Sequence, residues 1–314
     1  MLDRETIRSF INVAESASFS KAAEAMHKTP AAIGYRIKML EERVGTPLFH
    51  RTTRSVSLTS AGEYLLAQCY RWNTWLEGMS EELRQINDGV ERQVNIVVNN
   101  LLYSPVAAAE LLSHLNQLFP FTQVQISRQV YMGVWDTLLN DGYQIAIGAT
   151  GWESLDNGIN ILQLGELNWV FVIAPHHPLA KVTGSLTEDQ LRAYPAINIE
   201  DTSRNLPKRV AWLLPGQRDI KVPNLHTKLA CHLRGLGVGF LPKALCQPYL
   251  DDGSLIQRDV PHYRQPSPLC LAWKDATMGK VTQQIVSLFE ERSPIVQDFL
   301  YRIDSPISAA QGQP

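Results

Sequence analysis

Basic side chains within residues 26–60 are the first part of the chain whose residue types and spacing suit a chemical task. This stretch holds six lysines and arginines but two acidic residues, an excess of four positive charges, whereas the whole chain has a net charge of −2. Such a local excess attracts a polyanion and predicts contact with nucleic-acid phosphates. The basic residues are Lys28, Arg36, Lys38, Arg43, Arg51 and Arg54.

Two short helices joined by a tight turn are predicted to position most of these side chains. Ser18 or Ser20 can cap the first helix. Thr29 then caps the second helix, Pro30 is tolerated at its first position, and Gly45 ends it. A second helix with a basic outer face is typical of a helix-turn-helix. Its inward stripe is Ile33, Ile37, Leu40 and Val44, and its outer face carries Tyr35, Arg36 and Lys38.

A small β-wing is predicted directly after these helices. Val56 and Leu58 alternate with polar residues, as in a short strand, and Arg51 and Arg54 lie near the expected turn. Arginines on a wing reach phosphates or the minor groove. The alternative is a solvated three-helix module with scattered charge, because helix-turn-helix patterns alone produce many false positives.

A nearly unbroken pattern of residues runs through the first sixty or so positions. It consists of Phe10, Val13-Ala14-Glu15, Ser18-Phe19-Ser20-Lys21-Ala22-Ala23, Thr29-Pro30-Ala31-Ala32-Ile33, Leu40-Glu41-Glu42, Gly45, Leu48-Phe49, Arg51-Thr52, Leu58-Thr59 and Ala61-Gly62. This pattern resembles the DNA-binding region of the LysR-type transcriptional regulators. The family implies a winged helix-turn-helix that binds promoter DNA, a helix that joins two copies, and a domain that senses a small molecule.

The resemblance and the outer helix face together assign the DNA contacts. Pro30 stands where the family often has Gln, and Gly34 where it often has Ser, so two side chains that can hydrogen bond are missing. Tyr35 offers a substitute hydroxyl, and the operator sequence is left open. The assigned residues are Ser20, Thr29, Pro30, Ala31, Gly34, Tyr35, Arg36, Lys38, Arg51 and Arg54.

A long helix without proline is predicted over residues 59–87. Its apolar residues recur at alternating steps of four and three, the heptad spacing of a coiled coil. A helix packed on its own domain would drift toward a 3.6-residue period, so the spacing favours a two-helix dimer contact. A dimer lets two recognition helices read a two-fold operator, and the family implies pairs of dimers. The seam residues are Leu65, Cys69, Trp72, Leu76, Met79, Leu83 and Ile86.

The predicted fold class is α/β, with an all-α winged-helix domain at the N-terminus. The sensing domain resembles the two-subdomain, periplasmic-binding-protein-like effector domain of the family. The expected boundaries are 1–58 for the winged helix-turn-helix, 59–90 for the linker helix, 91–303 for the effector-binding domain (subdomain I about 91–163 and 267–303, subdomain II about 164–266) and 304–314 for a disordered tail.

Strands alternate with helices after Val90, which predicts mostly parallel, doubly wound sheets. Such sheets bind ligands beyond the carboxyl ends of their strands, near helix N-termini. Each residue there can instead be a turn, cap or packing residue, but the set suits a small, polar metabolite. Arg204, Lys208 and Arg209 indicate an anionic group on it or a solvated basic patch. The expected effector contacts are Asn99, Asn100, Tyr131, Met132, Gly133, Gly148, Thr150, Glu200, Asp201, Thr202, Asn224, His226 and Thr227.

The sequence argues against an enzyme, a metalloprotein and a membrane protein. The four cysteines form no CxxC pair and have no His at ligand spacing. The glycine-rich stretch at residues 235–239 follows a predicted helix and precedes a predicted strand, the reverse of a dinucleotide-binding loop. No run of 18 apolar residues occurs. We therefore expect a cytoplasmic protein with no cofactor, no metal ligand and no catalytic residue.

Three further stretches narrow the expected function within the family. Residues 87–96, 131–136 and 198–201 are similar to enterobacterial regulators that activate allantoin-utilisation genes. This implies activation of nitrogen recovery from purine breakdown, with a ureide or related metabolite as effector. The alternatives are another purine uptake or catabolic regulon and, more distantly, a small-molecule binding module without a DNA role. The expected partners are double-stranded promoter DNA, the effector, further copies of the chain as a dimer or tetramer, and RNA polymerase.

Overall fold

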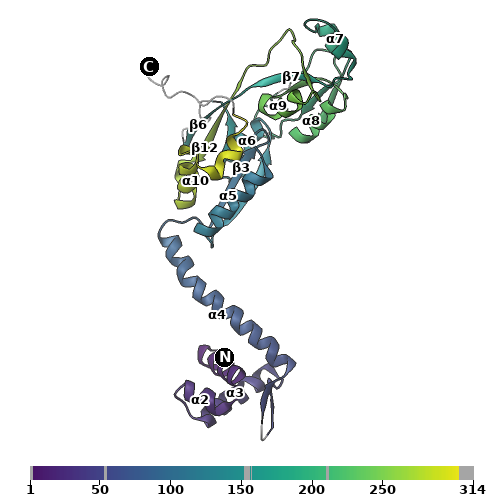
Figure 1. The fold of residues 1–314 in the computed structure, drawn as a ribbon. Helices are drawn as coiled ribbons and strands as arrows, with labels where there is room; N and C mark the ends of the chain where they lie inside the picture. Colours follow the sequence, from purple (N-terminus) through teal and green to yellow (C-terminus); the bar gives the residue numbers. More distant parts are fainter. Residues whose placement is uncertain (1–2, 53–54, 152–155, 157, 210–211, 304–314) are drawn as a thin grey trace. The chain divides into compact units, whose positions relative to one another are not determined.

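The computed structural model describes residues 3–52, 55–151, 156, 158–209 and 212–303. The chain divides into two units, residues 1–87 and 88–314, and each has its own core (Figure 1). The wing residue Arg54 and the expected tail, residues 304–314, lie outside the described residues.

The N-terminal unit is built from helices and one β-hairpin around an apolar core. Its elements are α1 (Arg4–Ser16), α2 (Phe19–Ala25), α3 (Pro30–Val44), β1 (Phe49–Arg51), β2 (Val56–Leu58) and α4 (Ser60–Asn87). The core unites Phe10 of α1, Ile33 and Ile37 of α3, and Phe49 of β1, all at most 4% exposed. The antiparallel pair β1–β2 forms the expected wing.

The ends of α3 follow from its flanking residues. The Thr29 hydroxyl accepts a hydrogen bond from the Ala32 backbone N–H, and Pro30 occupies the first helical position. Gly45 ends the helix with a φ of 71°, which glycine adopts without steric cost. Val44 was expected to face inward, and that expectation is wrong: it is the last residue of the helix and is 40% exposed.

Helix α4 changes role along its length. Cys69 is fully buried and Leu65 is half-buried in the core of the N-terminal unit, because the start of α4 packs on that unit. The expectation that Cys69 lies in a dimer seam is therefore corrected, and Leu65 serves the same core. The later seam residues differ, since Met79 is half-buried and the others are 39% to 61% exposed: Trp72, Leu76, Leu83 and Ile86.

Subdomain I of the second unit is a five-stranded sheet with helices on both faces (Figure 1). The strand order is β4 (Gln123–Gln129), β3 (Gln93–Asn99), β5 (Ile145–Thr150), β12 (Ser267–Lys274) and β6 (Ile159–Leu167). Val97 packs with α6 (Met132–Asn140), whereas Ile96 and Val98 pack with α5 (Pro105–Leu118) and α10 (Lys280–Glu290). Strands covered on both faces carry apolar residues at consecutive positions, as β3 does.

Subdomain II contains two small sheets and their helices. The first sheet has the antiparallel order β10 (Gly239–Pro242), β7 (Trp169–Ile173) and β11 (Ile256–Gln257), and β8 (Ala196–Ile199) pairs parallel with β9 (Asp219–Val222). The helices are α7 (Glu188–Arg192), α8 (Leu225–Leu233) and α9 (Lys243–Asp251), and the short α11 (Gln297–Leu300) follows α10 in subdomain I.

The sheets are mixed rather than mostly parallel, which corrects the sequence-based expectation. β3 runs parallel to β4 and β5, but β12 runs antiparallel to β5 and β6. The reason is that the chain leaves subdomain I along β6 and returns along β12. These two crossings run in opposite directions through one sheet.

The start of the second unit is fixed to its last long helix. The Glu91 carboxylate accepts hydrogen bonds from the backbone N–H groups of Gly279, Val281 and Thr282 at the N-terminus of α10. The Lys280 N–H donates to the carbonyl of Gly89. A carboxylate at this position satisfies N–H groups that a helix start leaves open and favours the helix dipole.

Candidate nucleic-acid interface and effector site

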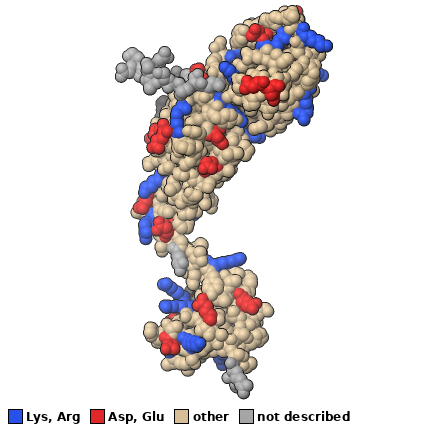
Figure 2. All heavy atoms as spheres, viewed as in Figure 1, with Lys and Arg blue, Asp and Glu red and all other residues tan. Residues whose placement is uncertain are grey.

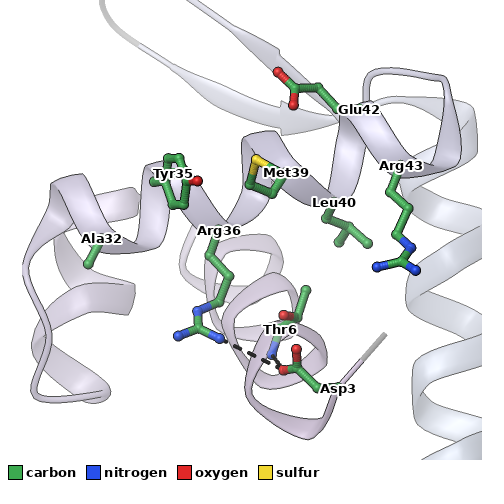
Figure 3. Close-up of a pocket in the computed structure, with 9 residues that line it drawn as sticks. All are labelled: Asp3, Thr6, Ala32, Tyr35, Arg36, Met39, Leu40, Glu42 and Arg43. Carbon is green, nitrogen blue, oxygen red and sulfur yellow. Dashed lines mark hydrogen bonds and ion pairs between the residues drawn. The ribbon is translucent and has the colours of Figure 1, made fainter. Parts of the chain in front are cut away.

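The outer face of α3 presents several of the residues expected to contact DNA. Tyr35 is 67% exposed, and Lys38 and Ala31 are exposed on the same helix. Met39, which is 45% exposed and was not among the expected DNA contacts, extends this face. Figure 3 shows Tyr35 and Met39 projecting from α3, with Arg36 turned toward α1.

Arg36 does not project freely from α3. Its guanidinium lies 3.8 Å from the Asp3 carboxylate and 3.2 Å from that of Glu5, both on or next to α1 (Figure 3 shows the Asp3 pair). The acidic partners are about half exposed. Such surface pairs contribute at most about 1 kcal/mol each, so a DNA phosphate can replace them.

Arg51 holds the wing to the rest of the unit. Its Nη2 lies 2.6 Å from Glu41 Oε2, and its guanidinium lies 4.8 Å from the ring centroid of Phe19. The other Glu41 oxygen accepts the backbone N–H groups of Leu48 and Phe49. Because the Arg51 side chain stays 39% exposed, its phosphate contact remains a prediction beside this structural role.

The other expected DNA contacts surround the start of α3. Ser20 is exposed on α2, and Thr29 and Pro30 are exposed where α3 begins. A Cβ atom at Gly34 would meet no atom within 4 Å, so this turn of the helix is open to an approaching ligand. Figure 2 shows basic and acidic side chains interspersed on the visible face of this unit rather than gathered in one basic patch.

The expected effector residues of subdomain I lie at the carboxyl edge of its sheet. Asn99 is bonded internally, since its Nδ2 donates to the Gly148 carbonyl and its Oδ1 accepts the Leu101 N–H. Asn100 and Thr150 differ, because Asn100 Nδ2 and Thr150 Oγ1 are buried and have no partner among the described residues. The two residues are 4% and 6% exposed. Buried polar atoms without partners are costly, so these two fit a polar ligand.

The N-terminus of α6 is bound by a carboxylate of subdomain II. Asp201 accepts the backbone N–H groups of Met132 at 3.2 Å and Gly133 at 3.1 Å. Tyr131, directly before them, has a φ of 49°, which is uncommon for a residue with a side chain. The structure thus brings together four residues that were expected to contact the effector: Tyr131, Met132, Gly133 and Asp201. The Asp201 carboxylate, however, is already hydrogen bonded within the protein. Asp201 also accepts the N–H groups of Ser203 and Arg209.

A second carboxylate makes the reverse contact. Asp136 of α6 accepts the backbone N–H groups of Arg204 at 2.6 Å and Asn205 at 2.8 Å, and the Nδ2 group of Asn140 at 2.7 Å. Burial alone would raise the pKa of Asp136, but the hydrogen bonds from Asn205 and Arg204 outweigh it and lower that pKa far below its ordinary value. The sequence alone does not single out Asp136, because it is one polar residue in an amphipathic helix.

We call the contact of residues 130–136 with residues 201–205 the subdomain junction. Thr202 completes it, because its hydroxyl accepts the backbone N–H of Val130 at 2.9 Å. A Cβ atom at Gly133 would overlap the Thr202 hydroxyl oxygen. The junction is therefore closely packed as well as hydrogen bonded.

Other expected effector residues serve local structure. Asn224 caps α8 by accepting the Thr227 N–H at 2.8 Å. Glu200 is exposed and lies 3.1 Å from Lys221 Nζ. Arg204 is 75% exposed, and Lys208 is 55% exposed and 3.9 Å from Glu200. Because Arg204 and Lys208 are exposed and already paired with carboxylates, they fit the solvated basic patch better than a site for an anionic group of the effector.

His226, at the start of α8, is exposed, although part of its side chain is covered. Burial and then the positive charges of Arg302 and Arg128 lower the pKa of His226. Arg302 donates to the carbonyl of Leu101 at 3.0 Å, which fixes it behind the carboxyl edge of the sheet.

Comparison with known proteins identifies the family. The family model "Bacterial regulatory helix-turn-helix protein, lysR family" matches residues 5–63, and the model "LysR substrate binding domain" matches residues 87–294. The chain belongs to the LysR family. The resemblance seen in its first sixty residues is thereby confirmed, and LysR membership makes the chain a DNA-binding transcriptional regulator.

Named relatives of this LysR-family chain are regulators. It is 58% identical over 300 residues to the HTH-type transcriptional activator AllS of Salmonella typhimurium, covering 96% of this chain and 97% of that relative. It is 31% identical over 288 residues to the HTH-type transcriptional regulator PunR of Escherichia coli K12, covering 92% and 93%. A solved structure of a Corynebacterium glutamicum OxyR C206 mutant aligns with a TM-score of 0.55 at 17% identity, covering 95% and 94%, and shows the fold alone.

The described part of this LysR-family chain contains no group of three or more His, Cys, Asp or Glu side chains arranged to hold a metal ion. None of the helices described is long and apolar enough to span a membrane. The glycine-rich stretch at residues 235–239 follows helix α8 and leads into strand β10, as the sequence predicted. This order is the reverse of that in a dinucleotide-binding loop. His177 accepts the backbone N–H of Leu179 through Nδ1, a capping role.

Proposed function

We propose that this LysR-family chain activates genes for nitrogen recovery from purine breakdown and responds to a small polar metabolite of that pathway. The observation that carries the proposal is the 58% identity to AllS, named as a transcriptional activator, over 96% of the chain. Residues 87–96, 131–136 and 198–201 support the narrower assignment to allantoin utilisation. A regulon shared with PunR, at 31% identity, is the second candidate.

We infer that the protein acts in the cytoplasm and that α3 enters the major groove of promoter DNA. Its exposed Tyr35 and Lys38 then reach base edges or the backbone, and the wing arginine Arg51 reaches a phosphate. When DNA binds, the Arg36 guanidinium leaves the carboxylates of Asp3 and Glu5 and pairs with a DNA phosphate instead.

We further propose that the second half of α4 joins two copies of the chain. Trp72 and Leu83 leave 40% and 61% of their surfaces exposed, at heptad positions along one helix face. Trp72→Glu should therefore convert a dimer to a monomer, because a charge would be buried in the seam. Sedimentation velocity measures this, and Thr74→Glu, an exposed position off the seam of the same helix, should leave the dimer intact. A dimer that survives Trp72→Glu would refute the seam.

The effector acts, in our proposal, on the arrangement of the two subdomains. The ligand binds, in this proposal, at the carboxyl edge, where Asn100 Nδ2 and Thr150 Oγ1 have no hydrogen-bond partner among the described residues. It can shift the subdomains only by binding one arrangement more tightly than the other.

Genome-wide DNA capture with the purified full-length protein tests the function, with and without a panel of purine-degradation metabolites. Peaks upstream of allantoin genes that respond to one compound are the expected result. Peaks elsewhere would retain the regulator and reject the allantoin regulon. Absence of peaks under every condition would contradict promoter binding.

A further inference from the structure

Glu5, in the first turn of α1, pairs with two basic side chains of the N-terminal unit. Its Oε1 atom lies 3.2 Å from Arg36 Nη2 on α3 and 3.5 Å from Lys28 Nζ. Lys28 stands in the turn between α2, which ends at Ala25, and α3, which begins at Pro30. One carboxylate oxygen therefore joins cations from two parts of the helix-turn-helix.

Acidic groups occupy both terminal nitrogens of the Arg36 guanidinium. Its Nη2 faces Glu5, and its Nη1 lies 3.8 Å from Asp3 Oδ1. Figure 3 shows this guanidinium directed toward Asp3 at the start of α1, whereas Tyr35 projects from α3 beside it. Arginine binds a phosphate in bidentate fashion through parallel N–H groups. Arg36 must therefore leave Glu5 before it can bind a DNA phosphate in this way.

The two acids differ in their other contacts. Asp3 caps α1, because its Oδ1 accepts the backbone N–H of Thr6 at 2.8 Å. The Glu5 carboxylate has no such role, since its only polar partners among the described residues are Lys28 and Arg36. A substitution of Glu5 therefore isolates the ion pairs, whereas a substitution of Asp3 would also remove the helix cap.

The exposure of these side chains makes their pairs weak enough to be exchanged. The side chains of Lys28, Glu5 and Arg36 are 50%, 46% and 33% exposed. Ion pairs this exposed are screened by salt and contribute little, so the dense phosphates of a duplex can replace the carboxylate. The displaced Glu5 and the phosphates are both negative and repel each other. Both cations therefore reach DNA in competition with Glu5.

We propose that Glu5 is an internal competitor of DNA phosphates that lowers the affinity of the chain for every duplex by occupying Lys28 and Arg36 in the free protein. The inference rests on the proposed function, because it takes the α3 surface as the DNA interface. Lys28, which was not among the expected DNA contacts, then becomes one of them. The effect does not depend on base sequence, because the exchanged partner is a phosphate and not a base edge.

Fluorescence anisotropy of the full-length protein with a nonspecific duplex tests the competition. Glu5→Gln keeps the shape of the side chain and removes its charge. We expect it to raise the affinity at low salt about threefold to tenfold, the range to which the strength of two surface ion pairs converts. The gain should shrink as the salt concentration rises, because salt screens exposed pairs. Duplexes recovered by genome-wide capture should gain by the same factor.

Two further variants separate the ion pairs from net charge. Glu24→Gln is the matched control, because Glu24 is an exposed acid of α2 in the same unit and forms no ion pair among the described residues. It removes the same charge and should change the affinity less than about twofold. In an Arg36→Ala background, Glu5→Gln should give a smaller gain, because one of the two cations that Glu5 occupies is absent.

A lower affinity in Glu5→Gln would overturn the proposal, because it would mean that the pairs hold Lys28 and Arg36 ready for DNA. Unchanged affinity, an equal gain in Glu24→Gln or an undiminished gain in the Arg36→Ala background would overturn it as well. In each of these cases the wild type still binds duplex DNA, so the regulator is retained. Failure of the wild type to bind any duplex would instead reject the proposed function.

Discussion

The α3 surface and the subdomain junction use the same chemical groups in opposite ways. On α3, Arg36 meets the half-exposed carboxylates of Asp3 and Glu5 at 3.8 and 3.2 Å. At the junction, Asp136 and Asp201 are 4% and 3% exposed and each accepts several backbone N–H groups. Surface pairs are weak and exchangeable, whereas buried carboxylates are costly to release. The α3 surface, our proposed DNA interface, is therefore suited to exchanging partners, and the junction is suited to holding one arrangement of the subdomains.

The largest expected effect comes from removing a junction carboxylate. Asp136→Ala should lower the free energy of unfolding of the second unit by about 3 kcal/mol, because buried N–H groups of Arg204 and Asn205 lose their acceptor. Urea unfolding followed by circular dichroism measures this. Asp141→Ala, at a more exposed carboxylate 3.9 Å from Arg204, is the control and should cost less than about 1 kcal/mol. Equal losses in both variants would contradict the comparison.

The same carboxylate predicts a dependence on pH. Because the folded pKa of Asp136 lies below its unfolded value, its stabilisation is complete above about pH 4 and is lost as the pH falls toward the folded pKa. The stability gap between the wild type and Asp136→Ala should therefore narrow on acidification below about pH 4. A gap that widens there would mean that the carboxylate is not stabilised by folding.

A pair of glycine substitutions sharpens the contrast at smaller cost. Gly133→Ala should destabilise the second unit by about 2 kcal/mol, since the new methyl group overlaps the Thr202 hydroxyl. Gly34→Ala should instead stabilise the N-terminal unit by up to about 1 kcal/mol, because alanine favours a helix and meets no atom. Thermal unfolding of both variants shows whether each substitution raises or lowers the melting temperature. Destabilisation by Gly34→Ala would show that this face of α3 is covered.

The smallest expected effect concerns stability on the DNA surface. Arg36→Ala should change the free energy of unfolding by less than about 1 kcal/mol, yet weaken binding to all duplexes and reduce the salt slope by about 1. Fluorescence anisotropy with nonspecific duplex at several salt concentrations measures this. Arg84→Ala, at an exposed arginine of α4, should leave the slope unchanged. If Arg36→Ala left the salt dependence of binding unchanged, Arg36 would serve only the ion pairs with Asp3 and Glu5 at α1.

Local sequence rules predicted the ends of α3 well, because Thr29, Pro30 and Gly45 act within one helical turn. They could not predict the partners of Arg36 or Asp136, which come from elements distant in sequence. They also assigned Cys69 to a dimer seam, although the same heptad position packs on the domain's own core.

The carboxylate of Glu91 has a consequence for how movement passes along the chain. Glu91 is bonded to the start of α10, and the carbonyl of Gly89 accepts the Lys280 N–H, so the chain is clamped to the second unit within a few residues of Asn87, where α4 ends. Only Asp88 separates the end of α4 from Gly89, whose carbonyl accepts the Lys280 N–H. If an effector moved α10, the hydrogen bonds of Glu91 and Gly89 would carry that movement to residues directly after the end of α4.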